Sequence, residues 1–111
     1  RHIVDCTDRV SIGAFTTVAG FRSQILTHSI DIEDSTQRAR PVVIGEYCMI
    51  GSGCIILKGA RVPRGTVLGA GSVFRGTPPG EYQLMSGVPA AVVRPLGEEQ
   101  AYFRRTAGPV A

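Results

Sequence analysis

The sequence from residue 44 to residue 74 reads IGEYCMIGSGCIILKGARVPRGTVLGAGSVF and repeats every six residues. A bulky apolar side chain stands at each sixth position, namely at Ile44, Ile50, Ile56, Val62, Leu68 and Phe74. A second series of small or slender side chains precedes the first by two residues, at Cys48, Cys54, Ala60, Thr66 and Ser72. An internal repeat of this kind decides the architecture before single helices or strands are assigned.

Both series must face the same side of the chain, because side chains in a strand alternate between its two faces. A triplet such as Cys48-Met49-Ile50 then points inward, outward and inward. The three residues between successive triplets contain Gly or Pro, as in Gly51-Ser52-Gly53 and Pro63-Arg64-Gly65, and such residues favour tight corners. The pattern predicts very short strands joined by three-residue corners.

Each hexapeptide supplies one strand and one corner, and three of them make one triangular coil. The inward side chains of successive coils then stack in a column at the centre of a prism. The sequence therefore predicts an all-β fold, a parallel β-helix of hexapeptide coils. The outward side chains stack as Met49 over Val67, Ile55 over Val73, and Val43 with Arg61. Two of the three faces are thus apolar, which favours a homotrimer in which each subunit contacts two neighbours.

The repeat extends backwards through Cys6, Ile12, Val18 and Gln24, and is then lost until Ile44. The interval from Val18 to Ile44 is longer than one coil, so a segment must leave the wall of the prism. We predict a protruding loop over residues 28–40, which are mostly polar. Loops on rigid scaffolds commonly carry function, and a plain solvated insertion is the alternative.

The two ends of the chain carry weaker signals. After Phe74 the period decays, and it resumes loosely at Gly87-Val88-Pro89-Ala90, where we predict a closing coil. The predicted hexapeptide domain covers residues 1–96, and residues 97–111 form a C-terminal helix and tail. A short helix over residues 97–105 would cap the open end of the sheets. The chain begins with Arg1 rather than Met, which leaves a missing N-terminal part open.

The composition excludes several classes of protein. A chain of 111 residues with 43% hydrophobic and 19% charged residues holds one globular domain. The net charge is +3, but the eleven Arg and one Lys are scattered, so a nucleic-acid surface is not predicted. No stretch approaches the roughly 20 apolar residues of a membrane span. Three cysteines make no disulfide framework and suit a reducing compartment, so we expect a cytoplasmic protein.

Histidine is the side chain best suited to acid and base chemistry near neutral pH, and the chain has two, His2 and His28. His28 stands where the repeat is lost, at the start of the protruding loop, and is the candidate general base. A lone His is more often structural or simply exposed. Cys48 and Cys54 occupy inward positions and are interpreted as packing residues rather than nucleophiles or metal ligands.

Six segments occur in an order that resembles a known family. They are Thr27-His28-Ser29-Ile30-Asp31, Pro41-Val42-Val43-Ile44-Gly45, Ile50-Gly51-Ser52-Gly53, Leu68-Gly69-Ala70-Gly71-Ser72-Val73, Gly87-Val88-Pro89-Ala90 and the charged loop between the first two. Together they resemble the hexapeptide-repeat O-acetyltransferases, in particular those that act on maltose, galactosides and polysaccharides. The resemblance runs from about Cys6 to Leu96.

The resemblance implies a left-handed winding of the coils and transfer of an acetyl group from acetyl-CoA, the co-substrate, to a hydroxyl. The acceptor would be a small molecule, a sugar or a glycan. The enzyme would be a homotrimer with active sites between subunits, and it would need no metal. His28 matches the general base, which takes the proton from the acceptor hydroxyl as it attacks the thioester. Asp31, or alternatively Glu33, would orient the imidazole.

The resemblance also implies residues that hold acetyl-CoA. Ser52 matches a position that contacts the pantetheine arm, and Ala70 matches one whose backbone hydrogen-bonds that arm. Arg94 matches a basic residue that meets the phosphates or adenine, and Arg75 falls near a Thr-Lys pair of the same site. Gly76 stands where this family usually has Lys, so that part of the nucleotide site departs from the pattern.

Two other functions remain as alternatives. The same β-prism serves γ-class carbonic anhydrases, whose zinc requires three His ligands, whereas this chain has two histidines. A non-catalytic assembly domain of a longer protein is the other alternative. Stabilisation of the fold by CoA, but not by zinc, would distinguish the transferase from both.

Overall fold

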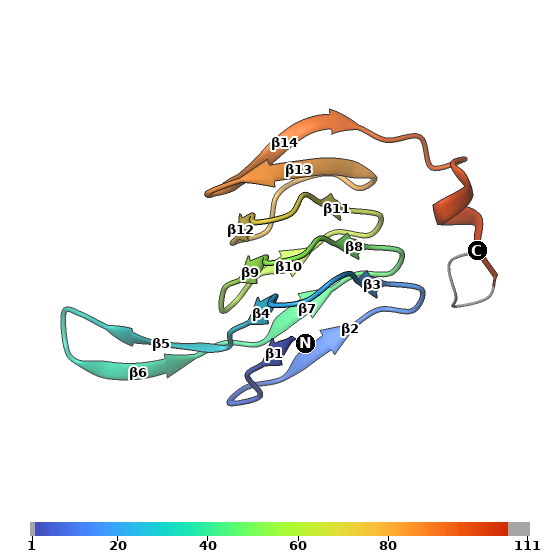
Figure 1. Cartoon of the computed structure of the whole chain (residues 1–111). Coiled ribbons are helices and arrows are strands. Elements are labelled where there is room, and N and C mark those ends of the chain that lie inside the picture. Colours follow the sequence, from blue (N-terminus) through green and yellow to red (C-terminus); the bar gives the residue numbers. More distant parts are fainter. Residues whose placement is uncertain (1, 107–111) are drawn as a thin grey trace.

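The computed structural model describes residues 2–106, whose strands form the three walls of a coil (Figure 1). Wall 1 contains β1 (Ile3–Val4), β4 (Gln24–Ile25), β9 (Ile55–Ile56) and β12 (Val73–Phe74), in this order. Wall 2 contains β2 (Val10–Ile12), β7 (Val42–Ile44) and β10 (Arg61–Val62), in this order. Wall 3 contains β3 (Thr17–Val18), β8 (Met49–Ile50), β11 (Val67–Leu68), β13 (Gln83–Gly87) and β14 (Ala90–Pro95), in this order.

Strands from successive coils pair in parallel at the spacing that the repeat predicts. Val62 pairs with Ile44, Leu68 with Ile50 and Phe74 with Ile56, so that each side chain covers the one three hexapeptides before it. All six side chains are buried, at 2% exposure or less. The predicted fold class, a left-handed parallel β-helix of hexapeptide coils, is confirmed.

The series of small side chains is also buried, and its hydroxyl groups hydrogen-bond to the backbone of two corners. Cys48, Cys54, Ala60, Thr66 and Ser72 are all exposed by 1% or less. Thr66 Oγ1 donates to the Pro63 carbonyl at 2.7 Å, and Ser72 Oγ donates to the Gly69 carbonyl at 2.7 Å. Burial raises the pKa of the Cys48 thiol, which keeps it protonated and inert. The interpretation of these cysteines as packing residues agrees with this geometry.

The first coil departs from the predicted phase by one residue. Ile12 pairs with Ile44 and Val18 with Ile50, as expected, but the residue that stacks on Ile56 is Ile25. The prediction that Gln24 continues the inward series is therefore wrong. Cys6 is exposed rather than inward. The corner between β3 and β4 has one residue more than the equivalent corner between β8 and β9, and burial of the apolar Ile25 in place of an amide sets the register.

The segment that leaves the prism is an antiparallel hairpin rather than an irregular loop. It consists of β5 (His28–Asp31) and β6 (Thr36–Ala39), and it projects from the left side of the prism in Figure 1. Arg38 donates to Asp31 Oδ2 at 3.2 Å and to Asp34 Oδ2 at 2.9 Å, which braces its outer half. Ile30 and Ile32 are exposed by 56% and 89%. The hairpin therefore has no core of its own.

The C-terminal part closes the prism differently from the prediction. The chain reverses at Gly87, which has a φ of 111°, and β14 returns antiparallel to β13. The predicted closing coil at residues 87–90 is therefore wrong, because these residues turn the chain back instead of around a corner. The backbone of β13 still pairs in parallel with β11, through Leu84 and Met85.

A short C-terminal helix is present, as predicted, but it differs in length and place. It is a 3-10 helix, η1 (Ala101–Arg104), instead of a helix over residues 97–105. It does not cap the open end, because Tyr102 donates to the Cys48 carbonyl at 2.7 Å and Phe103 is buried against the corner between walls 2 and 3. The predicted tail beyond residue 106 lies outside the described residues. No helix within residues 2–106 is long and apolar enough to cross a membrane.

Aromatic residues replace glycine at three turns of the corner between walls 2 and 3, where Phe15, Tyr47 and Tyr82 have φ of 60°, 56° and 53°. Tyr47 has a φ of 56°, in the left-handed region that Gly53, Gly59, Gly65 and Gly71 occupy at the equivalent corners. The Tyr47 ring stacks on Phe15 at 4.9 Å, and its hydroxyl donates to the Arg105 carbonyl at 2.5 Å. These contacts hold the segment that follows η1 against the coils and offset the cost of the unfavourable backbone conformation.

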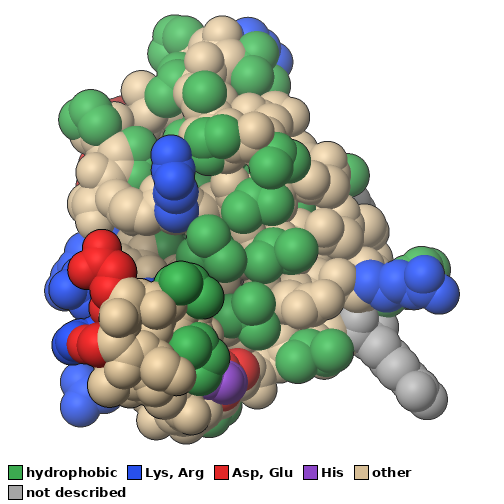
Figure 2. All heavy atoms as spheres, turned by 90° about the vertical axis from the view of Figure 1, so that its left-hand side faces the viewer, with side chains coloured by type: hydrophobic (Ala, Val, Ile, Leu, Met, Phe, Trp, Pro, Cys, Tyr) green, Lys and Arg blue, Asp and Glu red, His purple; other side chains and the backbone are tan. Residues whose placement is uncertain are grey.

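The outward side chains form the strips that the repeat predicts. Met49 lies beside Val67 on wall 3, and Ile55 lies beside Val73 on wall 1, all four half-buried. Val43 lies beside the exposed Arg61 on wall 2. Figure 2 looks at the side from which the hairpin projects and shows hydrophobic side chains gathered beside it. The molecule therefore presents two apolar walls to its surroundings.

The alternation within β9 gives a direct test of the column. We expect Ile56→Ala to lower the free energy of unfolding by about 2–5 kcal/mol, because Ile56 is 1% exposed and its loss leaves a cavity. Ile55→Ala is the matched control, since Ile55 is the next residue and faces outward. Urea unfolding of both variants should show a smaller loss of unfolding free energy for Ile55→Ala than for Ile56→Ala. A larger loss for Ile55→Ala would contradict the inward register.

Candidate functional site

The candidate base, His28, is the first residue of β5 and lies where the hairpin leaves wall 1. Its side chain is 41% exposed, and its Nδ1 atom contacts Asp5 Oδ2. Because the carboxylate can only accept, the imidazole Nδ1 must carry the hydrogen in this pair. The proton-free Nε2 of the neutral ring then faces away from Asp5. His28 is thus held in the tautomer that a general base requires.

The carboxylate of Asp5 is fixed by a set of donors on both of its oxygens. Oδ1 accepts from the Thr7 hydroxyl at 2.7 Å and from the Thr7 N–H at 3.0 Å. Oδ2 accepts from the Thr27 N–H at 3.1 Å in addition to the contact with His28. These hydrogen bonds, those from Thr7 above all, hold the pKa of Asp5 well below its usual range. Asp5 is therefore ionised at any pH near neutral.

Thr27 joins the segment of Asp5 to the strand of His28. Its side chain is fully buried, with Oγ1 donating to the Asp5 carbonyl at 3.0 Å and accepting from the Asp8 N–H at 3.0 Å. The N–H of Asp5 donates to the Ile25 carbonyl at 2.8 Å in the adjacent strand. The distance between Asp5 and His28 is thus set by buried backbone contacts rather than by two mobile side chains.

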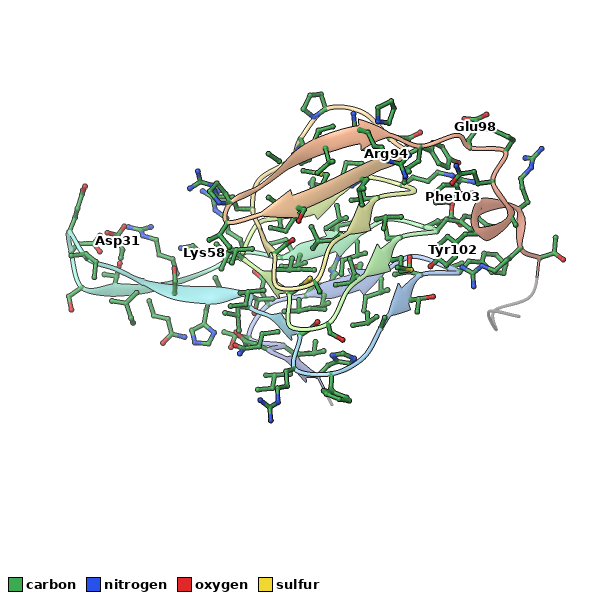
Figure 3. The ribbon with its side chains drawn as sticks, turned by 45° about the horizontal axis from the view of Figure 1, so that its top comes forward. Asp31, Lys58, Arg94, Glu98, Tyr102 and Phe103 are labelled. Atoms are coloured by element: carbon green, nitrogen blue, oxygen red, sulfur yellow. The ribbon has the colours of Figure 1, made fainter. Side chains whose placement is uncertain are left out.

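The residue predicted to orient His28 lies elsewhere. Asp31 is at the far end of β5, where its Oδ2 accepts from Arg38 and its Oδ1 from the Glu33 N–H at 3.0 Å. Figure 3 shows Asp31 toward the tip of the hairpin. Within the chain, Asp5 takes the place beside His28 that the sequence assigned to Asp31 or Glu33. The Asp5-Cys6-Thr7 motif is typical of a local turn, and gave no sign of a contact with a residue of the next coil.

A pocket of about 280 Å³ opens beside His28. It lies at the corner between walls 1 and 2, and it is lined by Leu26, His28, Ser29, Leu57, Lys58 and Arg75. Arg75, one of the predicted residues for acetyl-CoA, is therefore a neighbour of His28. Lys58 was not singled out by any motif. Figure 3 shows it between the prism and the base of the hairpin.

Ser52 and Ala70 lie together at a different corner, between walls 3 and 1. Both are exposed, and the Gly71 N–H donates to the Ser52 carbonyl at 2.9 Å between the two stacked turns. A Cβ on Gly51 would lie 2.8 Å from the Ala70 nitrogen, so glycine is required for this approach. Within one chain, wall 1 separates this corner from the pocket of His28.

Arg94 is exposed on β14, opposite Leu84. The strand ends near the corner between walls 2 and 3, since the Leu96 N–H donates to the Tyr82 carbonyl at 2.7 Å. Figure 3 labels Arg94 on this strand. The structure thus places the predicted residues in four places: His28 with Arg75, Ser52 with Ala70, Asp31 on the hairpin, and Arg94 on β14. Among residues 2–106, no three His, Cys, Asp or Glu side chains gather into a metal site.

Comparison with known proteins agrees with this fold. Residues 41–76 match the family described as bacterial transferase hexapeptide (six repeats). The chain is 30% identical over 101 residues to the putative acetyltransferase YvoF of Bacillus subtilis, covering 90% of this chain and 56% of that protein. It is 36% identical over 70 residues to the putative lipopolysaccharide biosynthesis O-acetyl transferase WbbJ of Escherichia coli, covering 63% of this chain and 35% of that protein.

Among solved structures, a galactoside acetyltransferase in complex with coenzyme A has a TM-score of 0.79 and 22% identity. The similarity covers 87% of this chain and 50% of that one. The chain spans about half, or less, of the length of these relatives. The resemblance to the hexapeptide-repeat acetyltransferases that the sequence motifs indicate is confirmed.

The hydrogen bonds of Asp5 can be tested against a second copy of the same motif. We expect Thr7→Val to raise the pKa of Asp5 toward its ordinary value, because the hydroxyl donor is lost. Thr36→Val is the matched control, since Thr36 donates to Asp34 through the same Asp-x-Thr arrangement and lowers the pKa of Asp34. It should raise the pKa of Asp34 and leave Asp5 unchanged. Carboxyl ¹³C NMR titration measures both.

Thr7→Val should also change how the stability of the fold depends on pH. The native pKa of Asp5 lies below that of the unfolded chain, so its hydrogen bonds stabilise the fold fully above about pH 4. This contribution fades as the pH falls through the native pKa. Thr7→Val should therefore be less stable than the wild type at neutral pH, and the gap should close in acid. An unchanged pKa of Asp5 in Thr7→Val would contradict the assignment.

Proposed function

We propose, from the premise that this chain is a hexapeptide-repeat protein similar to acetyltransferases, that it transfers an acetyl group from acetyl-CoA to a hydroxyl of a sugar or glycan. The observation that carries the proposal is the Asp5–His28 pair at the edge of a pocket. The ionised carboxylate holds Nδ1–H, and Nε2 is left to accept a proton. This is the arrangement of a general base that acts on a neutral hydroxyl.

In the proposed reaction, His28 Nε2 accepts the proton of the acceptor hydroxyl. At the same time, the hydroxyl oxygen forms a bond to the carbonyl carbon of the acetyl group. The bond between that carbon and the sulfur of CoA then breaks, and the imidazolium returns the proton to the sulfur, so that CoA leaves as a thiol. Asp5 stabilises the imidazolium between these two transfers. A well-placed base of this kind contributes about a hundredfold to ten thousandfold in rate.

Ser52, Ala70 and Arg94 are the residues we propose for binding acetyl-CoA. The corner that carries Ser52 and Ala70 is exposed, and the Ala70 N–H donates to no other described residue. An extended pantetheine arm has two amide groups that need hydrogen-bond partners, so an open N–H on a rigid corner suits it. Arg94 offers a guanidinium, which binds phosphate with two parallel hydrogen bonds.

We propose a homotrimer in which these residues meet His28 across a subunit boundary. One chain keeps Ser52 and Ala70 on the far side of wall 1 from the pocket of His28. A neighbouring copy that covers an apolar wall would bury Ile55 and Val73, or Met49 and Val67, and bring a second corner to the pocket. Apolar strips of this kind lose unfavourable contact with water when they are covered.

The histidines provide a matched pair of variants for the reaction. We expect His28→Ala to lower acetyl transfer by roughly a hundredfold or more, because the proton acceptor is lost. His2→Ala removes the other histidine, which lies at the opposite edge of wall 1, and should keep normal turnover. Transfer is measured as release of CoA in a screen of sugar and glycan acceptors, with the oligomeric state checked by sedimentation. Near-normal turnover of His28→Ala would refute the mechanism.

Arg94 provides a test of the coenzyme site. We expect Arg94→Ala to raise the KM for acetyl-CoA more than it lowers kcat, because it removes a ground-state contact with phosphate. Arg104→Ala, an exposed arginine in η1, is the control and should leave both constants unchanged. Steady-state kinetics with acetyl-CoA as the varied substrate measures the difference. An unchanged KM for acetyl-CoA in Arg94→Ala would show that Arg94 is an exposed surface residue with no part in coenzyme binding.

A further inference from the structure

Residues 22–28 run along wall 1 and lead from β4 into β5 (Figure 1). Every second side chain of this segment is buried at 3% exposure or less, namely Ser23, Ile25 and Thr27. The side chains between them are half-buried or exposed, namely Arg22, Gln24, Leu26 and His28. Because side chains alternate along an extended chain, the candidate base shares one outer face with Arg22 and Gln24.

Gln24 interrupts an apolar row on this face. Across wall 1 the outward residues are, in order, Ile3, Gln24, Ile55 and Val73. The side-chain amide of Gln24 forms no hydrogen bond with another described residue. Its carbonyl can accept and its NH2 group can donate, so both remain available to a molecule that lies on this face.

A second pocket, of about 410 Å³, opens at Gln24. It is lined by His2, Ile3, Arg22 and Gln24. Arg22 belongs to the corner between β3 and β4, which has one residue more than the equivalent corner between β8 and β9. Phe21, the residue before Arg22, is exposed by 63% on the same corner. The volume of this pocket is that of a small-molecule site.

The ring of His2 shapes the second pocket through the backbone. Its Nδ1 accepts from the Ser23 N–H at 3.2 Å, which holds the start of β1 against the turn that carries Arg22. We therefore assign His2 a structural role and no contact with a ligand. The polar groups left to meet a ligand in this pocket are those of Arg22 and Gln24.

The second pocket lies within reach of the candidate base. Leu26 and His28, which line the first pocket, follow Gln24 by two and four residues on the same face. Four residues of extended chain span at most about 14 Å, a distance that a few linked sugar units cover. The residues that the family resemblance implies for the coenzyme do not line the second pocket, namely Ser52, Ala70, Arg75 and Arg94.

We propose that the second pocket binds a further sugar unit of the acceptor, so that the substrate is an oligosaccharide or polysaccharide instead of a single sugar. The proposal rests on the proposed function and specifies its acceptor. The reacting unit lies at His28, and the glycan follows the outer face of residues 22–28. Its next units lie against Gln24 and Arg22.

The lining of the second pocket matches the surface of a sugar. A sugar ring has apolar C–H faces and a rim of hydroxyl groups, each of which can donate and accept. Ile3 provides an apolar contact for the ring, the Gln24 amide can donate to one hydroxyl and accept from its neighbour, and Arg22 donates. A wholly apolar ligand would leave the amide and the guanidinium without partners, at a cost in affinity.

The test measures how binding to the full chain depends on the length of the glycan. Probes of one, two and three units are used in three series, built from glucose, N-acetylglucosamine and sialic acid. ¹H–¹⁵N NMR spectra are read at the side-chain NH2 of Gln24 and the backbone N–H of Arg22. In at least one series, the Kd should fall by about tenfold or more from one unit to three, because the added units gain hydrogen bonds.

Gln24→Leu nearly keeps the volume of the side chain and removes its hydrogen-bonding groups. It should raise the Kd for the three-unit glycan by roughly tenfold and leave the Kd for the single sugar unchanged. Gln100→Leu is the matched control, since Gln100 is an exposed glutamine before η1 whose side chain makes no capping hydrogen bond. In the transfer assay, Gln24→Leu should raise the KM for the three-unit glycan and leave the KM for acetyl-CoA unchanged.

Four results would overturn the proposal. An affinity that does not depend on length in any series would remove the second sugar site, and transfer to a single sugar by the same protein would leave the acetyltransferase function intact. A raised KM for acetyl-CoA in Gln24→Leu would assign the pocket to the coenzyme. A changed sedimentation of Gln24→Leu would assign Gln24 to a contact between copies of the chain. Length-dependent binding with no transfer to any acceptor would refute the acetyltransferase function together with the acceptor role of the pocket.

Discussion

The stacking of each coil on the one before it, at intervals of three hexapeptides, is the constraint on which the rest of the molecule depends. Each inward side chain covers the one below it, so the column is continuous and no coil can shift along the chain without exposing its apolar series. The corners follow the same register, so that corner residues three hexapeptides apart stack on one another. Ser52 lies beneath Ala70 for this reason, and Lys58 lies beneath the turn of Arg75. Residues that act together are therefore spaced by the period of the fold instead of by a local motif.

The hairpin breaks this register and makes the site of His28. The pairing of Val18 with Ile50 spans more of the chain than one regular coil, because residues 28–40 leave the wall and return to it. The first strand of the hairpin starts at the edge of wall 1, beside the segment that carries Asp5. Thr27 is the last residue inside the prism, and its buried hydroxyl joins the two segments. An exposed imidazole is thus positioned by contacts that belong to the core.

The repeat predicted most of the fold, because a column of apolar side chains is a property of spacing alone. It predicted the inward and outward series, the projecting segment and the parallel walls. It did not predict the return of β14 along β13, since a strand at the end of a sheet can pair in either direction and a turn at Gly87 decides between them. The sequence motifs identified His28 but not its partner Asp5. The contact between them joins two successive coils, and it lies where the hexapeptide repeat is displaced by one residue. Lys58 was missed for a related reason, as only the stacked corners bring it to Arg75.

The charge of Asp5 determines how its surroundings act on His28. Asp5 is held as an anion by neutral donors from Thr7 and Thr27, so it can stabilise a positive imidazole without a competing cation beside it. Lys58 and Arg75 line the pocket beside His28 and form no ion pair with Asp5. Had either cation paired with Asp5, the carboxylate would have been neutralised and His28 would have lost its orienting partner.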